Sequence, residues 1–171
     1  MKNLIHFILT FMVLISLGCE TKPDQTLEYR IENINLELEG PVFEGSNEAQ
    51  VKVNFQPETV LDPAGLERKN IQNIRVKNIS LFMEEPQEFD LFESALVQLV
   101  GGEAPLTSVA LASAIPAGTN KLEPQVTDKN SFKEFKNVDS FFFVIDSNIK
   151  RQYEENIKMR GNIAFYIDVK K

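Results

Sequence analysis

The chain has 171 residues, and its 18 Lys and Arg against 25 Asp and Glu give a formal net charge of −7. This acidic balance disfavours nucleic acid as a partner, because phosphate contacts require basic side chains that displace counterions. The sole histidine is His6, the sole cysteine is Cys19, and tryptophan is absent. Beyond residue 19 the sequence therefore predicts no Cys/His zinc site, no histidine-dependent nucleophile and no internal disulfide.

The first nineteen residues have the layout of a secretory signal peptide. Lys2 supplies the positive start, and residues 4–17 are almost uninterrupted apolar sequence. A run of this length suits a signal peptide and is short for a bilayer span. Gly18 and Cys19 then supply a small residue and an acceptor thiol.

This segment resembles the signal peptides of bacterial lipoproteins, which are cut before a cysteine that carries diacylglycerol and usually a further acyl chain such as palmitate. Gly18 and Cys19 match the usual Leu, Ala/Ser, Gly/Ala, Cys pattern, whereas Ser16 and Leu17 depart from it. The resemblance implies cleavage between Gly18 and Cys19, lipidation of Cys19, and a membrane anchor in the cell envelope, at the outer membrane. An ordinary secreted protein and an uncleaved anchor remain alternatives, and the periplasmic or surface face stays open.

After a signal peptide (1–18) and a polar lipidated tether (19–25), one domain is expected over 26–171. Alternation of apolar and polar residues predicts strands over 26–38, 49–55 and 71–83. The apolar phase changes at Glu32-Asn33 and again inside 71–83, and both changes predict bulges. Turns are expected at Gly40-Pro41 and over 62–65.

The second half continues the same pattern. It predicts one helical turn within 86–93, and a second short helix that begins with a capping box of Ser131 and Glu134 and covers the core. A loop at Gly101-Gly102 carries no phosphate-binding pattern. The expected strands are 95–100, 107–114, an edge strand at 121–126, a strand over 140–145 that is apolar on both sides, and a long final strand over 157–169.

Eight or nine strands without a βαβ rhythm predict an all-β protein, an antiparallel two-sheet sandwich with one or two short helices. The organisation resembles small bacterial lipoproteins that carry an immunoglobulin-like sandwich. The Cys, Trp, Cys pattern of true immunoglobulin domains is absent.

Four segments are candidate functional sites. The acidic run 84–90 is either a carboxylate site or a solvated loop ahead of a helix. Residues 128–131 begin like a calcium loop and depart from it at Phe132, Lys133 and Asp139, so helix capping is the simpler reading. Residues 150–155 are a mixed-charge hairpin connection or an interaction site. Five phenylalanines of the second half either line a groove for an apolar ligand or fill the core; they are Phe132, Phe135, Phe141, Phe142 and Phe143.

These observations predict a non-catalytic envelope lipoprotein that binds a protein or glycan partner or has a structural role. No catalytic residue, cofactor site or metal ligand is predicted. The first alternative is a carboxylate-dependent glycan-active domain or a cation-dependent carbohydrate-binding domain, since acids are the one catalytic class that the sequence retains. The second alternative is a carrier of an apolar ligand.

Overall fold

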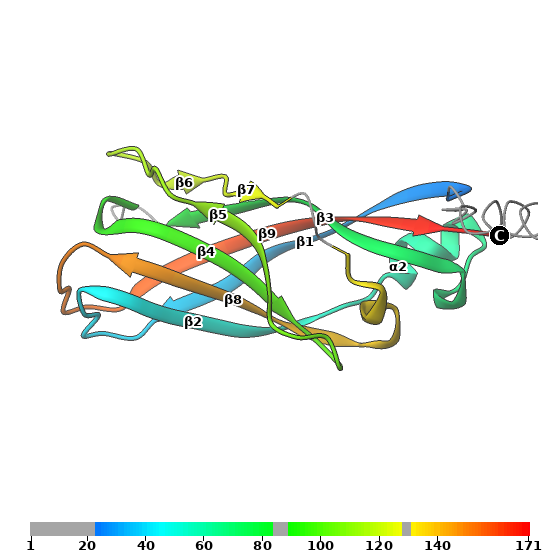
Figure 1. The fold of residues 1–171 in the computed structure, drawn as a ribbon, viewed down its shortest axis with the longest axis horizontal. Helices are drawn as coiled ribbons and strands as arrows, with labels where there is room; N and C mark the ends of the chain where they lie inside the picture. The colour runs from blue at the N-terminus through cyan, green and yellow to red at the C-terminus, as the bar shows by residue number, and fades with distance from the viewer. Residues whose placement is uncertain (1–22, 84–88, 128–130) are drawn as a thin grey trace, which may run out of the picture.

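The structure, a computed structural model, describes residues 23–83, 89–127 and 131–171. Within these ranges, nine strands form two antiparallel sheets that pack face to face (Figure 1). The prediction of an all-β antiparallel sandwich is therefore confirmed. The connections contain one turn of α-helix and four 3₁₀ segments: α2 (Glu58–Leu61), η1 (Asp62–Ala64), η2 (Arg68–Asn70), η3 (Phe89–Leu91) and η4 (Lys133–Asn137).

The two sheets contain four and five strands. The order in the first sheet is β1 (Gln25–Leu38), β9 (Ile157–Val169), β3 (Ile71–Met83) and β6 (Lys121–Leu122). The order in the second sheet is β2 (Gly45–Asn54), β8 (Ser140–Ile149), β4 (Phe92–Val100), β5 (Thr107–Ala112) and β7 (Gln125–Val126).

The strands pair in a nested series. β1 pairs with β9, β2 with β8, β3 with β6 and β4 with β5. A long antiparallel hairpin that rolls up, so that successive pairs enter alternate sheets, has this order, and the result is a jelly roll. The last strand consequently lies inside the first sheet, between β1 and β3. Immunoglobulin domains instead have sheets ABED and CFG, so the sandwich is as predicted while its connectivity differs from the immunoglobulin-like order.

Both predicted bulges are present. The pairing of β1 with β9 shifts between Ile31 and Ile34, and the pairing of β3 with β9 shifts between Val76 and Asn78. At the first bulge, Asn33 adopts a φ of 58° and its N–H donates to Oδ1 of Asn162 at 2.9 Å. The bulge restores the inward direction of the following apolar residues, because the side-chain period of a strand is two.

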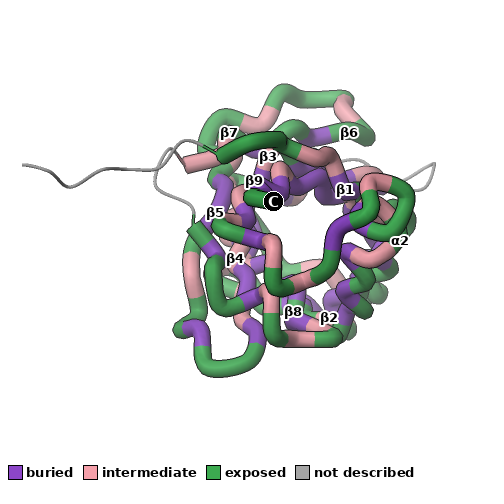
Figure 2. Tube along the Cα trace, turned by 90° about the vertical axis from the view of Figure 1, so that its right-hand side faces the viewer, coloured by how far each residue is buried: buried purple, intermediate pink, exposed green. Residues whose placement is uncertain are grey.

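An aromatic cluster occupies the interior at the end of the sandwich where β2 ends and β8 begins. The Phe55 ring lies 5.3 Å from Tyr29, 6.2 Å from Phe135 and from Phe141, and 5.8 Å from Phe165. All four contacts are edge-to-face, a preferred arrangement of aromatic pairs. Figure 2 shows the alternation of buried and exposed residues along the strands that surround this interior.

The single edge strand expected over 121–126 is wrong. Lys121 and Leu122 pair with β3 of the first sheet, whereas Gln125 and Val126 pair with β5 of the second. Pro124 lies between the two pairs and has no N–H to donate to either sheet. The segment therefore crosses from one sheet to the other along the side of the sandwich.

The capping box expected at Ser131 and Glu134 is also wrong. The segment is a 3₁₀ helix, η4, which begins after Phe132 and has no side-chain cap. The Ser131 hydroxyl instead donates to Oδ1 of Asn73 at 2.7 Å. The predicted cover over the core is present, because Phe132 and Phe135 are both buried. Burial of these two rings, rather than capping, positions the segment.

Candidate binding surface

Several predicted site residues lie outside the described ranges. These are Gly18 and Cys19, the acidic residues 84–88, and residues 128–130. The last acid of the run, Asp90, is described, and its Oδ1 accepts the N–H of Gly118 at 2.8 Å. Asp90 therefore joins two loops at one end of the sandwich.

The mixed-charge segment 150–155 is not a hairpin connection, because β8 and β9 lie in different sheets. Backbone hydrogen bonds hold the segment at two positions. At the first, the Lys150 N–H donates to the carbonyl of Leu91 at 2.8 Å. Tyr153 and Val42 exchange two backbone hydrogen bonds of 2.7 and 2.9 Å. The segment is an ordered arch from one sheet to the other, and these contacts account for its placement.

Asp168 is the one buried acid among the described residues, with an exposed fraction of 6%. The Thr26 hydroxyl donates to it at 2.7 Å, and Nε and Nη2 of Arg75 donate to its two oxygens at 3.0 Å each. An acid held by this many donors is a structural anion. Within the described ranges it has no buried acidic neighbour of the kind that glycoside hydrolysis needs.

A second charged group lies on the outer face of the first sheet. Lys77 donates to Glu28 at 2.6 Å, and Arg30 donates to the same carboxylate. These hydrogen bonds, that of Lys77 first, lower the pKa of Glu28, and the bond to Glu28 raises the pKa of Lys77. Tyr166 lies beneath Lys77 and Arg75, at 5.2 and 5.5 Å from its ring centre. These shifts keep Glu28 and Lys77 ionised at neutral pH. A general acid or base instead needs a pKa near the working pH.

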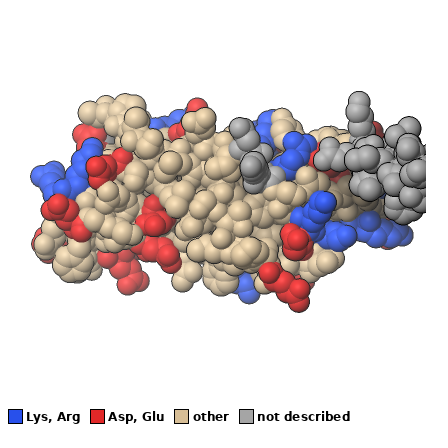
Figure 3. Space-filling model, in the orientation of Figure 1, with Lys and Arg blue, Asp and Glu red and all other residues tan. Residues whose placement is uncertain are grey.

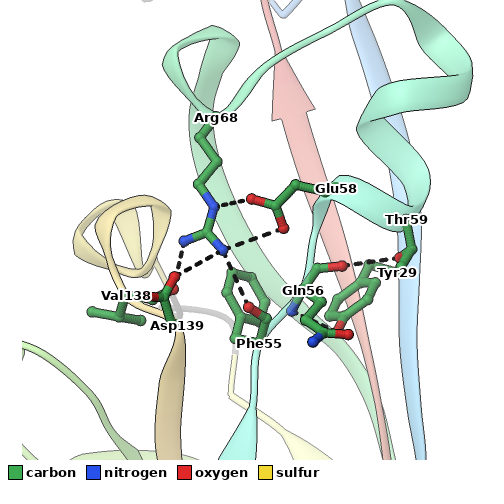
Figure 4. A network of polar contacts seen from close by, with 8 residues as sticks. All are labelled: Tyr29, Phe55, Gln56, Glu58, Thr59, Arg68, Val138 and Asp139. Atoms are coloured by element: carbon green, nitrogen blue, oxygen red, sulfur yellow. Dashed lines mark hydrogen bonds and ion pairs between the residues drawn. The ribbon is translucent and has the colours of Figure 1, made fainter.

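Arg68 links three connections at the end of the sandwich that contains the aromatic cluster (Figure 4). Its guanidinium donates to the carbonyl oxygens of Val138 at 2.6 Å and of Phe55 at 3.3 Å. It also contacts the carboxylates of Glu58 and Asp139. The hydrogen bond from Arg68 is the main cause of the lowered pKa of Glu58. This network fastens α2 and η2 to the start of β8.

Metal ligands are not assembled in the described part of the chain, where no group of three or more His, Cys, Asp or Glu could hold an ion. Every buried side-chain nitrogen or oxygen in that part has a hydrogen-bond partner. No helix within the described ranges has the length and apolarity to cross a bilayer. The remaining features that could recognise a ligand are on the surface.

An open groove of about 570 Å³ lies where β5 ends and the chain turns back toward β6 and β7. It is lined by residues of 111–125, among them Leu111, Pro116, Lys121 and Leu122. Lys121 forms an ion pair with Glu123 at 2.6 Å on its wall. The groove therefore combines apolar and charged walls, and it lies at the end of the sandwich away from both described chain termini (Figure 1).

An apolar stripe crosses the outer face of the second sheet and reaches this groove. Strand register places Val100 opposite Phe142 and Leu96 opposite Leu111. Between these two pairs the polar Gln98 lies opposite Val144, which is 3% exposed. Phe142 is 41% exposed and Leu111 is 43% exposed. Figure 3 shows that acidic and basic side chains leave much of one face of the molecule uncharged. We refer to the five apolar residues of this face as the apolar stripe; they are Leu96, Val100, Leu111, Phe142 and Val144.

The stripe resolves the alternatives for the phenylalanines. Phe132, Phe135, Phe141 and Phe143 are buried and fill the core. Phe142 points to the other side of β8, where Val144 also lies, so residues 140–145 are apolar on both sides as expected. On that outer side Phe142 is 41% exposed and Val144 is 3% exposed. The alternation of 141–143 alone places Phe142 opposite to its neighbours, and this signal could have identified it as a surface residue.

Comparisons with known proteins add no family. No family model matches the chain, and no curated protein matches it. Among solved structures, a chain from the three-dimensional structure of Cocksfoot mottle virus matches with a TM-score of 0.27 and 8% identity, over 86% of this chain and 84% of that chain. Nothing about function follows from a match at that level.

Proposed function

We propose that this protein is a non-catalytic lipoprotein of the bacterial cell envelope, anchored at the outer membrane through lipid on Cys19, whose sandwich binds a partner protein. The observation that carries the binding role is the apolar stripe, with Phe142 and Leu111 both more than two-fifths exposed on an ordered sheet. Large apolar side chains that gather on a folded surface are typical of interaction sites.

The geometry of the tether supports this arrangement. Five residues lie between Cys19 and Gln25, the first residue of β1, and the six steps from one to the other can span about 20 Å when extended. The N–H of Asp24 donates to the carbonyl of Val169 at 3.0 Å, so the start and the end of the domain lie together. The groove over 111–125 lies at the opposite end (Figure 1), and attachment at Cys19 leaves it open.

The anchor is tested in cells by metabolic labelling with a fatty acid and by membrane fractionation. The wild-type chain is expected to carry label and to sediment with membranes. Cys19→Ala is expected to lose both properties, because it lacks the acceptor thiol. Acyl label that persists in Cys19→Ala would contradict the proposed anchor.

The binding role is tested by crosslinking the tagged full-length chain in cells, extracting it in detergent and identifying what it captures by mass spectrometry. One partner protein is expected at constant stoichiometry with wild-type chain. Leu111→Ser and Phe142→Ser are expected to reduce its recovery. Phe43→Ser is the matched control, since Phe43 is 59% exposed and lies outside the apolar stripe. Equal recovery with all three variants, or capture of no other protein, would overturn the proposal.

A further inference from the structure

β2 forms an open edge of the second sheet, with β8 as its one strand neighbour among the described residues. The N–H of Phe55 donates to the carbonyl of Asp139 at 2.8 Å, and this pair continues the register of Asn54 with Ser140. In an antiparallel pair, bonded and non-bonded positions alternate. Odd-numbered residues of β2 therefore bond to β8, and even-numbered residues direct their N–H and C=O groups toward the open side.

The five even-numbered residues also have exposed side chains; they are Ser46, Glu48, Gln50, Lys52 and Asn54. Within the described ranges, neither Glu48 nor Lys52 makes an ion pair. Glu48 lies opposite another acid, Asp146, in the register with β8. The edge thus has a negative position and a positive position, each two residues from Gln50.

This pattern is self-complementary. We propose that a second copy of this chain pairs with the first along β2, antiparallel, about a two-fold axis through Gln50. Glu48 of each copy then lies opposite Lys52 of the other, and Ser46 lies opposite Asn54. All five outward-facing residues enter hydrogen-bonded pairs, and the two five-stranded sheets become one continuous sheet.

The charges select this register among its neighbours. Sliding one copy by two residues moves Glu48 away from Lys52 of the other copy. Sliding it by four residues sets Glu48 against Glu48, or Lys52 against Lys52, and like charges directly opposite each other are destabilising. In the proposed register each lysine also approaches Asp146 of the other copy, which neighbours Glu48. The second copy thereby supplies the cation that this pair of acids lacks.

The arrangement is compatible with the tether. The two-fold axis of an antiparallel edge pairing is perpendicular to the sheet, so both copies present the same face to the same side. Their tethered ends point in opposite directions along the strands. Two lipids reach one bilayer when the sheets lie parallel to it.

The register is tested by disulfide formation in the full-length chain under mild oxidation. Gln50→Cys places two thiols opposite each other, with Cα atoms about 5.5 Å apart, a separation that a disulfide spans. Ser46→Cys is the matched control on the same strand, because its two copies would lie about 27 Å apart, eight residues along the strand. The unaltered chain, whose sole cysteine is Cys19, gives the background.

Covalent dimer is expected for Gln50→Cys, and only background for Ser46→Cys. Equal crosslinking of the two variants would overturn the register. The absence of crosslinked dimer in both would overturn the pairing itself. Gln50→Cys combined with Leu111→Ser is expected to crosslink as before, so this result is independent of partner binding at the apolar stripe.

Charge reversal gives a second measurement. Glu48→Lys and Lys52→Glu each place like charges opposite each other twice, and each is expected to weaken the dimer about tenfold in sedimentation experiments in detergent. The double variant Glu48→Lys with Lys52→Glu restores both opposite pairs and is expected to recover the wild-type dimer. Failure of the double variant to recover, while both single variants dissociate, would overturn the proposed pairing of charges.

Discussion

Replacement of Arg68 by methionine is expected to destabilise the fold by about 3 kcal/mol, as the sum of the contributions below. Methionine keeps most of the apolar stem and removes the guanidinium, which joins α2 and η2 to the start of β8 (Figure 4). Two backbone carbonyls, those of Val138 and Phe55, lose a charged donor. The Arg68 side chain is 25% exposed, so water replaces these donors only in part.

The magnitude follows from the partners. Each hydrogen bond to a charged group contributes about 1.5–3 kcal/mol, and partial exposure favours the low end of that range. The ion pair with Glu58, which is 44% exposed, adds about 0.2–1 kcal/mol. Asp139 is 96% exposed and adds little. Arg68→Lys is expected to lie between wild type and Arg68→Met, because an ammonium cannot reproduce the planar fork.

The assay is urea unfolding of the full-length protein in detergent, followed by circular dichroism at pH 7. Lys69→Met is the matched control, since Lys69 is the adjacent residue and its ion pair with Glu67 is 72% and 71% exposed. That variant is expected to remain within about 0.5 kcal/mol of wild type. A loss below about 1 kcal/mol for Arg68→Met, or a loss equal to that of Lys69→Met, would mean that the Arg68 guanidinium does not hold these connections together.

The difference in unfolding free energy between wild type and Arg68→Met is expected to depend on pH. Arg68 lowers the pKa of Glu58 below its ordinary value of 4.5. The stabilisation by this ion pair is therefore complete above that value and is lost as the pH falls through the lowered pKa. Because Glu58 is 44% exposed, the free-energy difference between wild type and Arg68→Met is expected to narrow by no more than the value of an exposed ion pair, about 1 kcal/mol, between pH 7 and pH 3. A difference that widens would contradict the assignment.

Three further substitutions probe the fold by the same unfolding measurement. Phe55→Ala removes the ring that contacts Tyr29, Phe135, Phe141 and Phe165, and is expected to cost about 3–5 kcal/mol; a cost below 1 kcal/mol would mean that the cluster is not close-packed. Gly101→Ala places a Cβ 2.9 Å from Cβ of Phe141 and is expected to cost about 1–3 kcal/mol, whereas a neutral result would show that the loop relaxes. Asn33→Ala is expected to cost about 1 kcal/mol more than Asn33→Gly, because φ is 58° at the bulge, and the reverse order would exclude that conformation.

Much of the fold could be predicted because its signals are local. The alternation of 157–169 predicts a strand with one buried face, and Ile157, Ile163 and Val169 are buried as expected. The phase change beside Asn33 predicts a bulge, and the register shift lies there. Each of these patterns shows which side chains of one strand face the core, and it can be recognised from the residues of that strand alone.

The candidate surface could be predicted less well. The apolar stripe includes Leu96, Leu111 and Phe142, which belong to three strands, and their placement on one face depends on strand register. Arg68 shows no motif, since two of its four partners are the backbone carbonyls of Phe55 and Val138, beside the carboxylates of Glu58 and Asp139. The role of Arg68 in joining the connections therefore cannot be predicted without the positions of backbone atoms that lie 13 and 70 residues away in the sequence.

Local sequence patterns were sufficient to predict the β-rich class, the strand faces and the bulges, whereas the lipidated segment ending at Cys19 stays a prediction. The nesting of the strand pairs into a jelly roll, the division of 121–126 between two sheets and the position of β2 at an edge became visible in the folded chain alone. The difference lies in the range of the interactions. Alternation follows from the burial of one face of each strand, whereas the choice of neighbouring strands depends on how the whole chain closes around a shared core.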